Sequence, residues 1–157
     1  MRYDGGHKRA EALYRHLEGR GVEWISFCPE LDAGMGVPRE PVGLVGEAQN
    51  PRMLGKDTGR DWTLRMLELC RRRVMEFKSM RVSGFVLKKL SPSCGLDRVP
   101  VLSATGEEGS GSTGPGLFAR VLMQELPGLP VVDEEALLTE SGAADFLERS
   151  RLYKEQK

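Results

Sequence analysis

Gly84-Phe85-Val86-Leu87-Lys88 is a short apolar run that begins at a glycine and ends at a lysine. A run of this length predicts a buried β-strand. It leads into Ser91-Pro92-Ser93-Cys94-Gly95, where proline and glycine predict a shaped loop. Amphipathic stretches on either side, residues 58–80 and 116–126, predict helices. Because strands alternate with helices, we expect a single α/β domain with a largely parallel, Rossmann-like sheet and helices on both faces.

The rest of the chain continues this alternation. The long helix is expected to start at Thr58 or Asp61, either of which can cap its first turn, and to end near Met80. Residues 104–115 are rich in glycine, serine and threonine and predict a loop. The apolar side of the long helix is expected to hold Leu64, Leu67, Val74 and Phe77. The remaining predictions are helices over residues 7–18 and 143–153, and strands over residues 22–27, 41–45 and 130–132.

Length and charge exclude several classes of protein. The chain has 157 residues, which predicts one domain over residues 1–157. Its 23 basic and 23 acidic residues give a formal net charge of zero, whereas a general nucleic-acid binder needs a basic surplus. No apolar run reaches the roughly 18 residues of a membrane span, and the first residues do not resemble a secretory signal. We therefore expect a soluble cytoplasmic protein with no membrane partner, and a monomer is favoured.

The three cysteines, Cys28, Cys70 and Cys94, make an odd number. A small secreted domain normally has paired cysteines, so thiols in a reducing compartment fit better. Cys70 lies in the middle of the predicted long helix and is expected to fill the core. Cys28 and Cys94 each follow a predicted strand, at the position where ligands bind in parallel α/β sheets. Both are candidate site residues, although a small buried hydrophobe is an equally good interpretation of their spacing.

Polar residues beside these cysteines are candidates for chemistry. Glu30 follows the Cys-Pro pair at residues 28–29, and a buried carboxylate at a cysteine site can act as a general acid or base. A solvated loop glutamate is the alternative. Ser91 and Ser93 can donate hydrogen bonds to sulfur or to a substrate, or they can simply stabilise their loop. The basic run at residues 71–73 lies among acidic residues on the long helix and predicts a solvated face.

Five motifs follow one another in an order that resembles the thiouracil desulfurase family of small bacterial proteins. They are Arg2-Tyr3-Asp4-Gly5-Gly6-His7-Lys8, Cys28-Pro29-Glu30, Pro38-Arg39-Glu40-Pro41, Gly59-Arg60-Asp61-Trp62-Thr63 and Leu87-Lys88-Lys89-Leu90-Ser91-Pro92-Ser93-Cys94-Gly95. The resemblance spans nearly the whole chain, and five ordered motifs are much more specific than any one of them. Within these motifs, Arg39, Asp61 and Thr63 are expected to hold loops together by hydrogen bonds rather than to do chemistry.

The resemblance implies an oxygen-sensitive [4Fe-4S] cluster held by three cysteines, with one iron open for substrate. Cys28 and Cys94 match the second and third of these ligands, whereas Cys70 matches no motif cysteine. The family's first ligand belongs to a Cys-Leu-Leu-Gly segment before the Arg-Tyr-Asp-Gly-Gly motif, and this chain starts at Met1. At the position of Met1 the family has a valine. We therefore expect the first strand and the first cluster cysteine to lie upstream of Met1. Upstream in-frame codons for such a segment would support this expectation, and an immediate stop codon would contradict it.

The activity implied by the resemblance is removal of sulfur from a thiolated pyrimidine, such as 2-thiouracil, to give uracil and sulfide. The open iron would bind the exocyclic sulfur as a Lewis acid, and water would replace the sulfur without net electron transfer. Glu30 would then act as the general acid or base, and Ser91 or Ser93 would position the substrate. The alternatives are a non-catalytic module that binds a nucleobase or a thiolated RNA base, and an inactive fragment that lacks its first strand.

Overall fold

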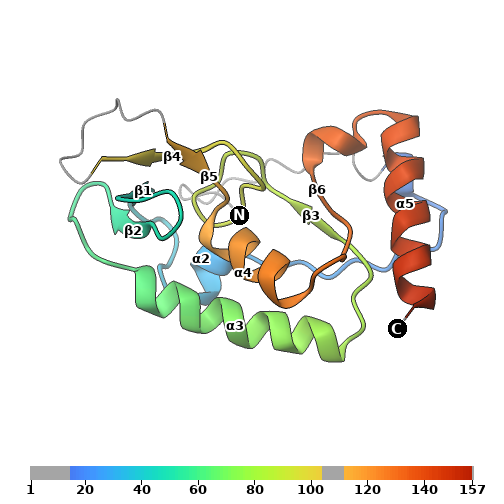
Figure 1. Ribbon diagram of the computed structural model, residues 1–157, viewed down its shortest axis with the longest axis horizontal. Helices are drawn as coiled ribbons and strands as arrows, with labels where there is room; N and C mark the ends of the chain where they lie inside the picture. Colours follow the sequence, from blue (N-terminus) through green and yellow to red (C-terminus); the bar gives the residue numbers. More distant parts are fainter. Residues whose placement is uncertain (1–14, 104–111, 157) are drawn as a thin grey trace.

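A computed structural model describes residues 15–103 and 112–156 of the chain. Residues 15–17 are helical and belong to the helix expected over residues 7–18, and residue 18 is already in a turn; residues 7–14 of that helix and the first motif lie outside the described residues. The elements that follow are α2 (Pro29–Asp32), β1 (Val42–Val45), β2 (Arg52–Gly55), α3 (Thr63–Ser79), β3 (Phe85–Leu87), β4 (Val99–Leu102), β5 (Thr113–Gly114), α4 (Leu117–Glu125), β6 (Val131–Asp133), the 3₁₀ helix η1 (Glu134–Leu137) and α5 (Glu140–Glu155), as labelled in Figure 1.

The larger sheet has the strand order β2-β1-β4-β5 and is mixed. β1 pairs antiparallel with β2 and parallel with β4, whereas β4 pairs antiparallel with β5. The prediction of a largely parallel, Rossmann-like sheet is therefore wrong for these strands. The connection between β1 and β2 is only residues 46–51, too short for the crossover that two parallel neighbours need. The α/β class itself is confirmed.

The smaller sheet pairs β3 with β6 in parallel, with Phe85 opposite Val131. Alternation along the strands sends Phe85 and Leu87 toward a core shared with α3 and α4. Val86 and Val132 instead pack with Phe146 of α5. The two-stranded sheet thus lies between two hydrophobic clusters and has helices on both faces, as Figure 1 shows. The expected parallel, helix-covered arrangement is found between these two strands.

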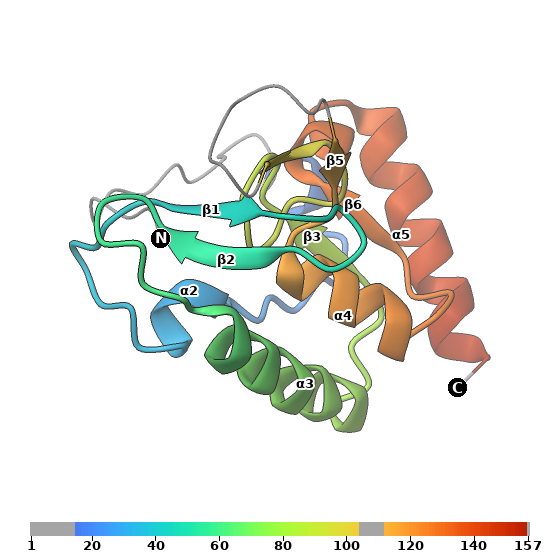
Figure 2. The same cartoon turned by 60° about the vertical axis from the view of Figure 1, so that its left-hand side comes forward.

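α3 is the long helix predicted over residues 58–80, and it lies with α4 on one side of β1 and β2 (Figure 2). Its buried side is largely the one predicted: Val74 and Phe77 are buried and Leu67 packs against the core, whereas Leu64 is 77% exposed. The fully buried positions include Met66, Cys70 and Val74, which are spaced four residues apart and form one stripe of the helix. The predicted start at Thr58 or Asp61 is wrong, because the helix begins at Thr63 after Trp62, which makes no side-chain cap hydrogen bond. Asp61 nevertheless accepts a hydrogen bond from the Thr63 amide at 2.9 Å.

Residues 22–27 do not form the predicted strand, and no element is assigned there between the turn at residues 18–21 and α2. Trp24 and Ile25 are 41% and 48% exposed, so their apolar character does not reflect burial in a sheet. Conversely, β2 and β4 were not expected from the sequence, and part of the predicted loop, residues 113–114, pairs as β5. Across the described ranges, no helix is long and apolar enough to cross a membrane.

Candidate functional site

Cys28 and Glu30 are placed by α2, a helix of four residues. Cys28 is the extended residue before the first turn, and Pro29 occupies the first helical position, where a missing N–H costs nothing. The Asp32 amide donates to the Cys28 carbonyl at 3.0 Å, which closes the turn. Cys28 therefore lies at the start of a helix. The prediction that it ends a strand is wrong. Glu30, in the first turn, projects from the same short element.

Cys94 lies in the loop after β3, which is held on the first turn of α4. The Leu117 amide donates to the Pro92 carbonyl at 3.1 Å, and the Phe118 amide donates to the Ser93 carbonyl at 2.9 Å. The first amides of a helix have no partner inside it, so the loop carbonyls satisfy donors that would otherwise be unpaired. These hydrogen bonds support the Cys94 loop rigidly on α4. The prediction that Cys94 follows a strand is confirmed, because β3 precedes it.

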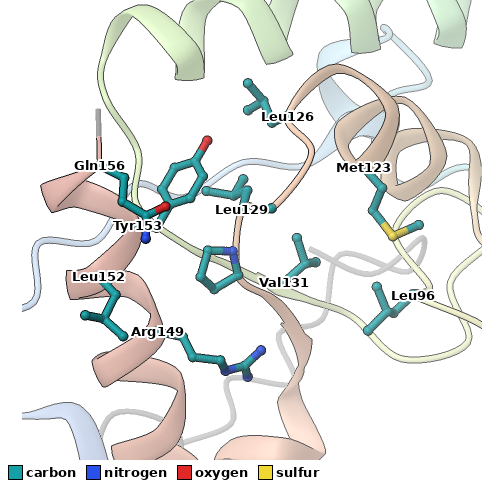
Figure 3. A pocket seen from close by; sticks show the side chains of 11 residues that line it. Leu96, Met123, Leu126, Leu129, Val131, Arg149, Leu152, Tyr153 and Gln156 are labelled. Atoms are coloured by element: carbon teal, nitrogen blue, oxygen red, sulfur yellow. The ribbon is translucent and has the colours of Figure 1, made fainter.

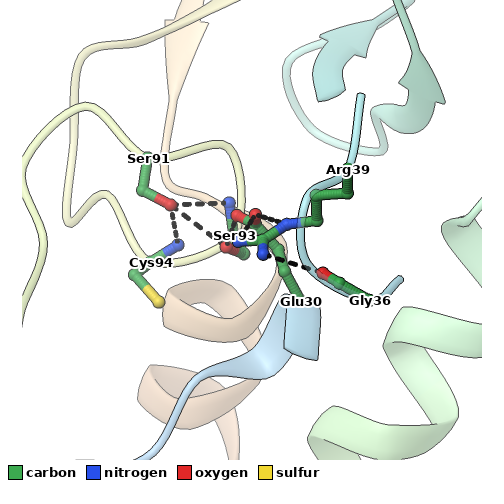
Figure 4. Close-up of polar contacts among 6 residues, drawn as sticks. All are labelled: Glu30, Gly36, Arg39, Ser91, Ser93 and Cys94. Atoms are coloured by element: carbon green, nitrogen blue, oxygen red, sulfur yellow. Dashed lines mark hydrogen bonds and ion pairs between the residues drawn. The ribbon is translucent and has the colours of Figure 1, made fainter. Parts of the chain in front are cut away.

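Glu30 connects the segment after α2, which holds Arg39, to the loop that holds Cys94. It uses both carboxylate oxygens, as Figure 4 shows. Arg39 donates to Oε2 from Nε at 3.0 Å and from Nη2 at 2.7 Å. The Ser93 hydroxyl donates to Oε1 at 2.6 Å. Only 14% of the Glu30 side chain and 4% of the Arg39 side chain are exposed, so this ion pair is well shielded from water. Glu30 is therefore not the solvated loop glutamate that the sequence left open.

The two serines connect this carboxylate to the cysteine loop. The Ser91 and Ser93 hydroxyl oxygens lie 3.0 Å apart, and the Ser91 oxygen accepts a hydrogen bond from the Cys94 amide at 3.2 Å. Because Ser93 donates its proton to Glu30, Ser91 supplies the proton of the bond between the two hydroxyls. Glu30, Ser91, Ser93 and Cys94, all predicted as site residues, thus lie in one hydrogen-bonded network.

Burial sets the acidity of two of the cysteines. Burial raises the pKa of the Cys94 thiol to about 12, and the charges of Glu30, Cys28 and Cys70 raise it as well, while a hydrogen bond from Ser93 lowers it. Burial also raises the pKa of Cys70 to about 12. None of the three forms a disulfide, and Cys70 is fully buried in the core, as expected from its place in the helix. Within residues 15–103 and 112–156, no three His, Cys, Asp or Glu side chains are grouped to hold a metal ion.

The residues expected to hold loops do so. Arg39 also donates from Nη1 to the Gly36 carbonyl at 3.2 Å, which ties the segment after α2 to Glu30. Asp61 accepts from Arg52 at 2.8 Å, and the Thr63 hydroxyl accepts from the Met53 amide at 2.8 Å. Apart from the place of Arg39 in one of the ordered motifs, no pattern in the sequence predicts its contact with Glu30.

Arg73 is a residue whose role the sequence missed. The run at residues 71–73 predicted a solvated face, but the Arg73 guanidinium contacts the Asp32 carboxylate at 2.5 Å. This ion pair joins α3 to the last residue of α2, two residues after Glu30. Its partners are 41 residues apart, so no local pattern points to it.

Two pockets border these elements. One, of about 340 Å³, is lined by Met35, Arg39, Glu40 and Trp62 among others. Because Arg39 also contacts Glu30, this pocket lies beside the network. The other, of about 470 Å³, lies between α4, β6 and α5; Figure 3 shows its apolar side chains, including Leu126, Leu129 and Leu152, with Arg149 at its edge. It is lined by none of the network residues.

The comparisons with known proteins agree with the motifs. The sequence model of the family described as 2-thiouracil desulfurase matches residues 1–134. The chain belongs to this family. A relative from Bacillus subtilis strain 168, the uncharacterized protein YbbK, is 28% identical over 141 residues, which are 87% of this chain and 89% of the relative. A solved structure of the [4Fe-4S]-dependent thiouracil desulfidase TudS matches with a TM-score of 0.60 and 23% identity, covering 91% of this chain and 88% of that one.

Each comparison supports a different statement about this desulfurase family member. The family match covers all five motifs, four of which lie within the described residues. The network of Glu30, Ser93 and Cys94 is inside the matched range. The TudS structure shows that the two chains share a fold. α5 lies beyond residue 134, and so does most of one wall of the apolar pocket in Figure 3.

Proposed function

We propose that this chain removes sulfur from a thiolated pyrimidine such as 2-thiouracil, and releases uracil and sulfide. Family membership supports the class of reaction. The observation that carries the proposal is the contact between Glu30 and Ser93, because it places a carboxylate one hydroxyl away from the Cys94 loop. A general acid or base has to lie within hydrogen-bond reach of the group it serves, directly or through one bridging group, and this arrangement meets that condition.

The cofactor of this proposal is a [4Fe-4S] cluster, in keeping with the name of the TudS neighbour. Such clusters are held by cysteine thiolates, and we propose Cys28 and Cys94 as two of them. The described residues do not complete the ligand set, because Cys70, the remaining cysteine, is fully buried among core side chains. The raised pKa of Cys94 adds a requirement: metal binding has to displace the proton that burial keeps on this thiol. The residues present therefore fit part of the group only.

The chain's own residues account for the proton movements of the reaction. Water adds its oxygen to the ring carbon, the carbon–sulfur bond breaks, and both water protons end on the departing sulfur, so no electrons are gained or lost. Glu30 is placed to take the first proton as a general base. Ser93 donates to Glu30, and a hydrogen bond from Ser93 lowers the pKa of Cys94, so its hydroxyl can serve one partner at a time and pass a proton between the carboxylate and sulfur. Arg39 holds the second Glu30 oxygen and fixes the carboxylate in place.

Glu30→Gln tests this proposal, since an amide cannot accept the proton. We expect sulfide release from 2-thiouracil to fall by at least about a hundredfold, the usual contribution of a general base. Glu68→Gln, at an exposed position of α3, is the matched control and should keep normal activity. Sulfide and uracil are measured without oxygen after iron and sulfide have been supplied. Equal turnover by Glu30→Gln and the unchanged chain would remove Glu30 from the mechanism.

The cofactor is tested separately by iron and acid-labile sulfide per chain, on this chain and on a version extended by the in-frame codons upstream of Met1. We expect Cys28→Ala and Cys94→Ala to lose the cluster, and Cys70→Ala to keep it. Loss of iron in Cys70→Ala would instead make Cys70 a ligand. Binding of 2-thiouracil without release of sulfide by any version would favour the non-catalytic binding module.

A further inference from the structure

α2 is too short to keep its own shape. It has four residues, and Cys28 at its start makes no side-chain cap hydrogen bond to the first turn. Isolated helices need roughly 12 residues or more to persist in water, so a helix of this length depends on what it packs against. Because α2 places both Cys28 and Glu30, any group that holds α2 also holds one half of the candidate site.

Arg73 of α3 contacts both flanks of that segment. Its Nη2 lies 2.5 Å from the Asp32 carboxylate, at the end of α2. Its guanidinium also lies over the ring of Phe27, 5.6 Å from the centroid, directly before Cys28. A third contact, from Nη1 to Glu76 at 2.7 Å, fixes the guanidinium on α3 itself. One guanidinium group thus contacts Phe27, immediately before Cys28, and Asp32, two residues after Glu30.

The same contacts tie the two halves of the site together. The Phe27 ring packs against Phe118 of α4 at 4.9 Å and against Phe77 of α3 at 5.4 Å. The Phe118 amide, in turn, donates to the Ser93 carbonyl of the cysteine loop. Movement of Phe27 would therefore change the position of Cys28 relative to the loop that carries Cys94.

We propose that Arg73 is a positioning residue, which holds the Cys28–Glu30 segment in register with the Ser91–Cys94 loop. Its catalytic consequence rests on the proposed desulfurase function, whereas its effect on the position of Cys28 does not. Lysine cannot replace it fully, because a point charge can pair with Asp32 but cannot also cover Phe27 and contact Glu76 with one flat group.

The first test measures the alkylation rate of each cysteine by iodoacetamide in the reduced, metal-free chain, read by peptide mass spectrometry. For Arg73→Ala we expect Cys28 to react at least about threefold faster, because α2 opens locally more often. Fully buried Cys70 should stay protected, which shows that the core is intact. Arg72→Ala is the matched control: Arg72 is the preceding residue, its side chain is 68% exposed, and its one ion pair among the described residues is with Glu76 at 3.9 Å. Arg73→Lys should give an intermediate rate.

Equal Cys28 rates in Arg73→Ala and Arg72→Ala would overturn the proposal. If Arg73→Ala also exposes Cys70, Asp32→Asn decides, because it removes the charge of the partner and leaves α3 unchanged. Faster alkylation of Cys28 in that variant, with Cys70 still protected from alkylation, supports the proposal. An unchanged alkylation rate of Cys28 contradicts it.

The second test separates this inference from the proposed function. In chains that release sulfide, Arg73→Ala should lower kcat about tenfold with KM nearly unchanged, because misplaced catalytic groups affect the reaction more than binding. If no chain releases sulfide, the proposed function fails, and the alkylation rates still decide whether Arg73 positions Cys28.

Discussion

Ser93 has one hydroxyl proton and two acceptors that compete for it. It donates to Glu30 at 2.6 Å, and a hydrogen bond from the same residue lowers the pKa of Cys94. A hydroxyl has one proton and cannot donate to both partners at once, so it donates to the stronger acceptor. At 1% exposure, Ser93 is shielded from water that could replace either bond. Through this competition, a change in the charge of the Glu30 carboxylate changes the hydrogen bond that Ser93 offers to the Cys94 thiol.

Ser93→Ala should therefore make Cys94 a weaker acid. Loss of the hydrogen bond removes the contribution that lowers its pKa, while burial and the nearby charges continue to raise it. At pH 9 the smaller thiolate fraction should slow alkylation of Cys94 by roughly threefold or more, because only the thiolate reacts. Ser79→Ala, at the end of α3, is the control and should leave the rate unchanged. A Cys94 rate that does not fall would show that Ser93 donates to Glu30 alone.

The candidate site residues could be picked out from short motifs, because each motif is a contiguous turn. Cys28 and Glu30 lie in one turn of α2, and Ser91, Ser93 and Cys94 lie in one loop. Arg73 could not be predicted in this way. Its role depends on the packing of α2 against α3, and the sequence holds no local trace of that packing.

At the scale of elements, the contact of the cysteine loop with α4 depends on Gly116. A Cβ atom at this position would lie 2.5 Å from the Ser93 carbonyl oxygen and 2.8 Å from that of Pro92. Both neighbours are backbone atoms, which cannot turn aside as a flexible side chain can. Glycine is needed here for close approach, since its φ of −62° is open to any residue.

Gly116→Ala should therefore destabilise the protein by about 2–4 kcal/mol, the range for overpacking at a tight backbone contact. Gly43→Ala is the matched control, because its Cβ would meet only the Lys56 side chain at an ordinary 3.5 Å. Urea unfolding of the two variants measures the difference. Stability of Gly116→Ala equal to that of Gly43→Ala would mean that the loop is not held tightly on α4.

The elements that the sequence failed to predict carry weak patterns for physical reasons. β4 contains Pro100, which lacks the amide donor of a ladder and argues against a strand. β2 is four residues long and holds an arginine and a glycine, so its apolar content is low. β3 and β6 were predicted because both of their faces are buried, and a continuous apolar run results.

At the scale of the whole molecule, Cys70 reports on the main core. It is fully buried in the cluster that joins α3, α4 and both sheets, and burial raises its pKa from 9.0 to about 12, although the charge of Arg71 lowers it slightly. Below pH 9 the folded and unfolded chains both keep the proton, so this thiol adds no pH dependence. Between pH 9 and 12 the unfolded chain loses the proton and the folded chain keeps it. The unfolded state then binds fewer protons, and stability falls as the pH rises.

Cys70→Ala removes this contribution and so tests the burial of the thiol directly. In the unchanged chain, the slope of unfolding free energy against pH should be steeper by about 1.4 kcal/mol per pH unit between pH 9.5 and 10.5 than in Cys70→Ala. Lysines and tyrosines also titrate there, but they are common to both chains and cancel in the difference. Urea unfolding at pH 7, 9.5 and 10.5 provides the slopes, and the pH 7 value separates any cost of the lost sulfur itself. Parallel slopes would mean that Cys70 ionises in the folded protein, and hence that the core around α3 admits water.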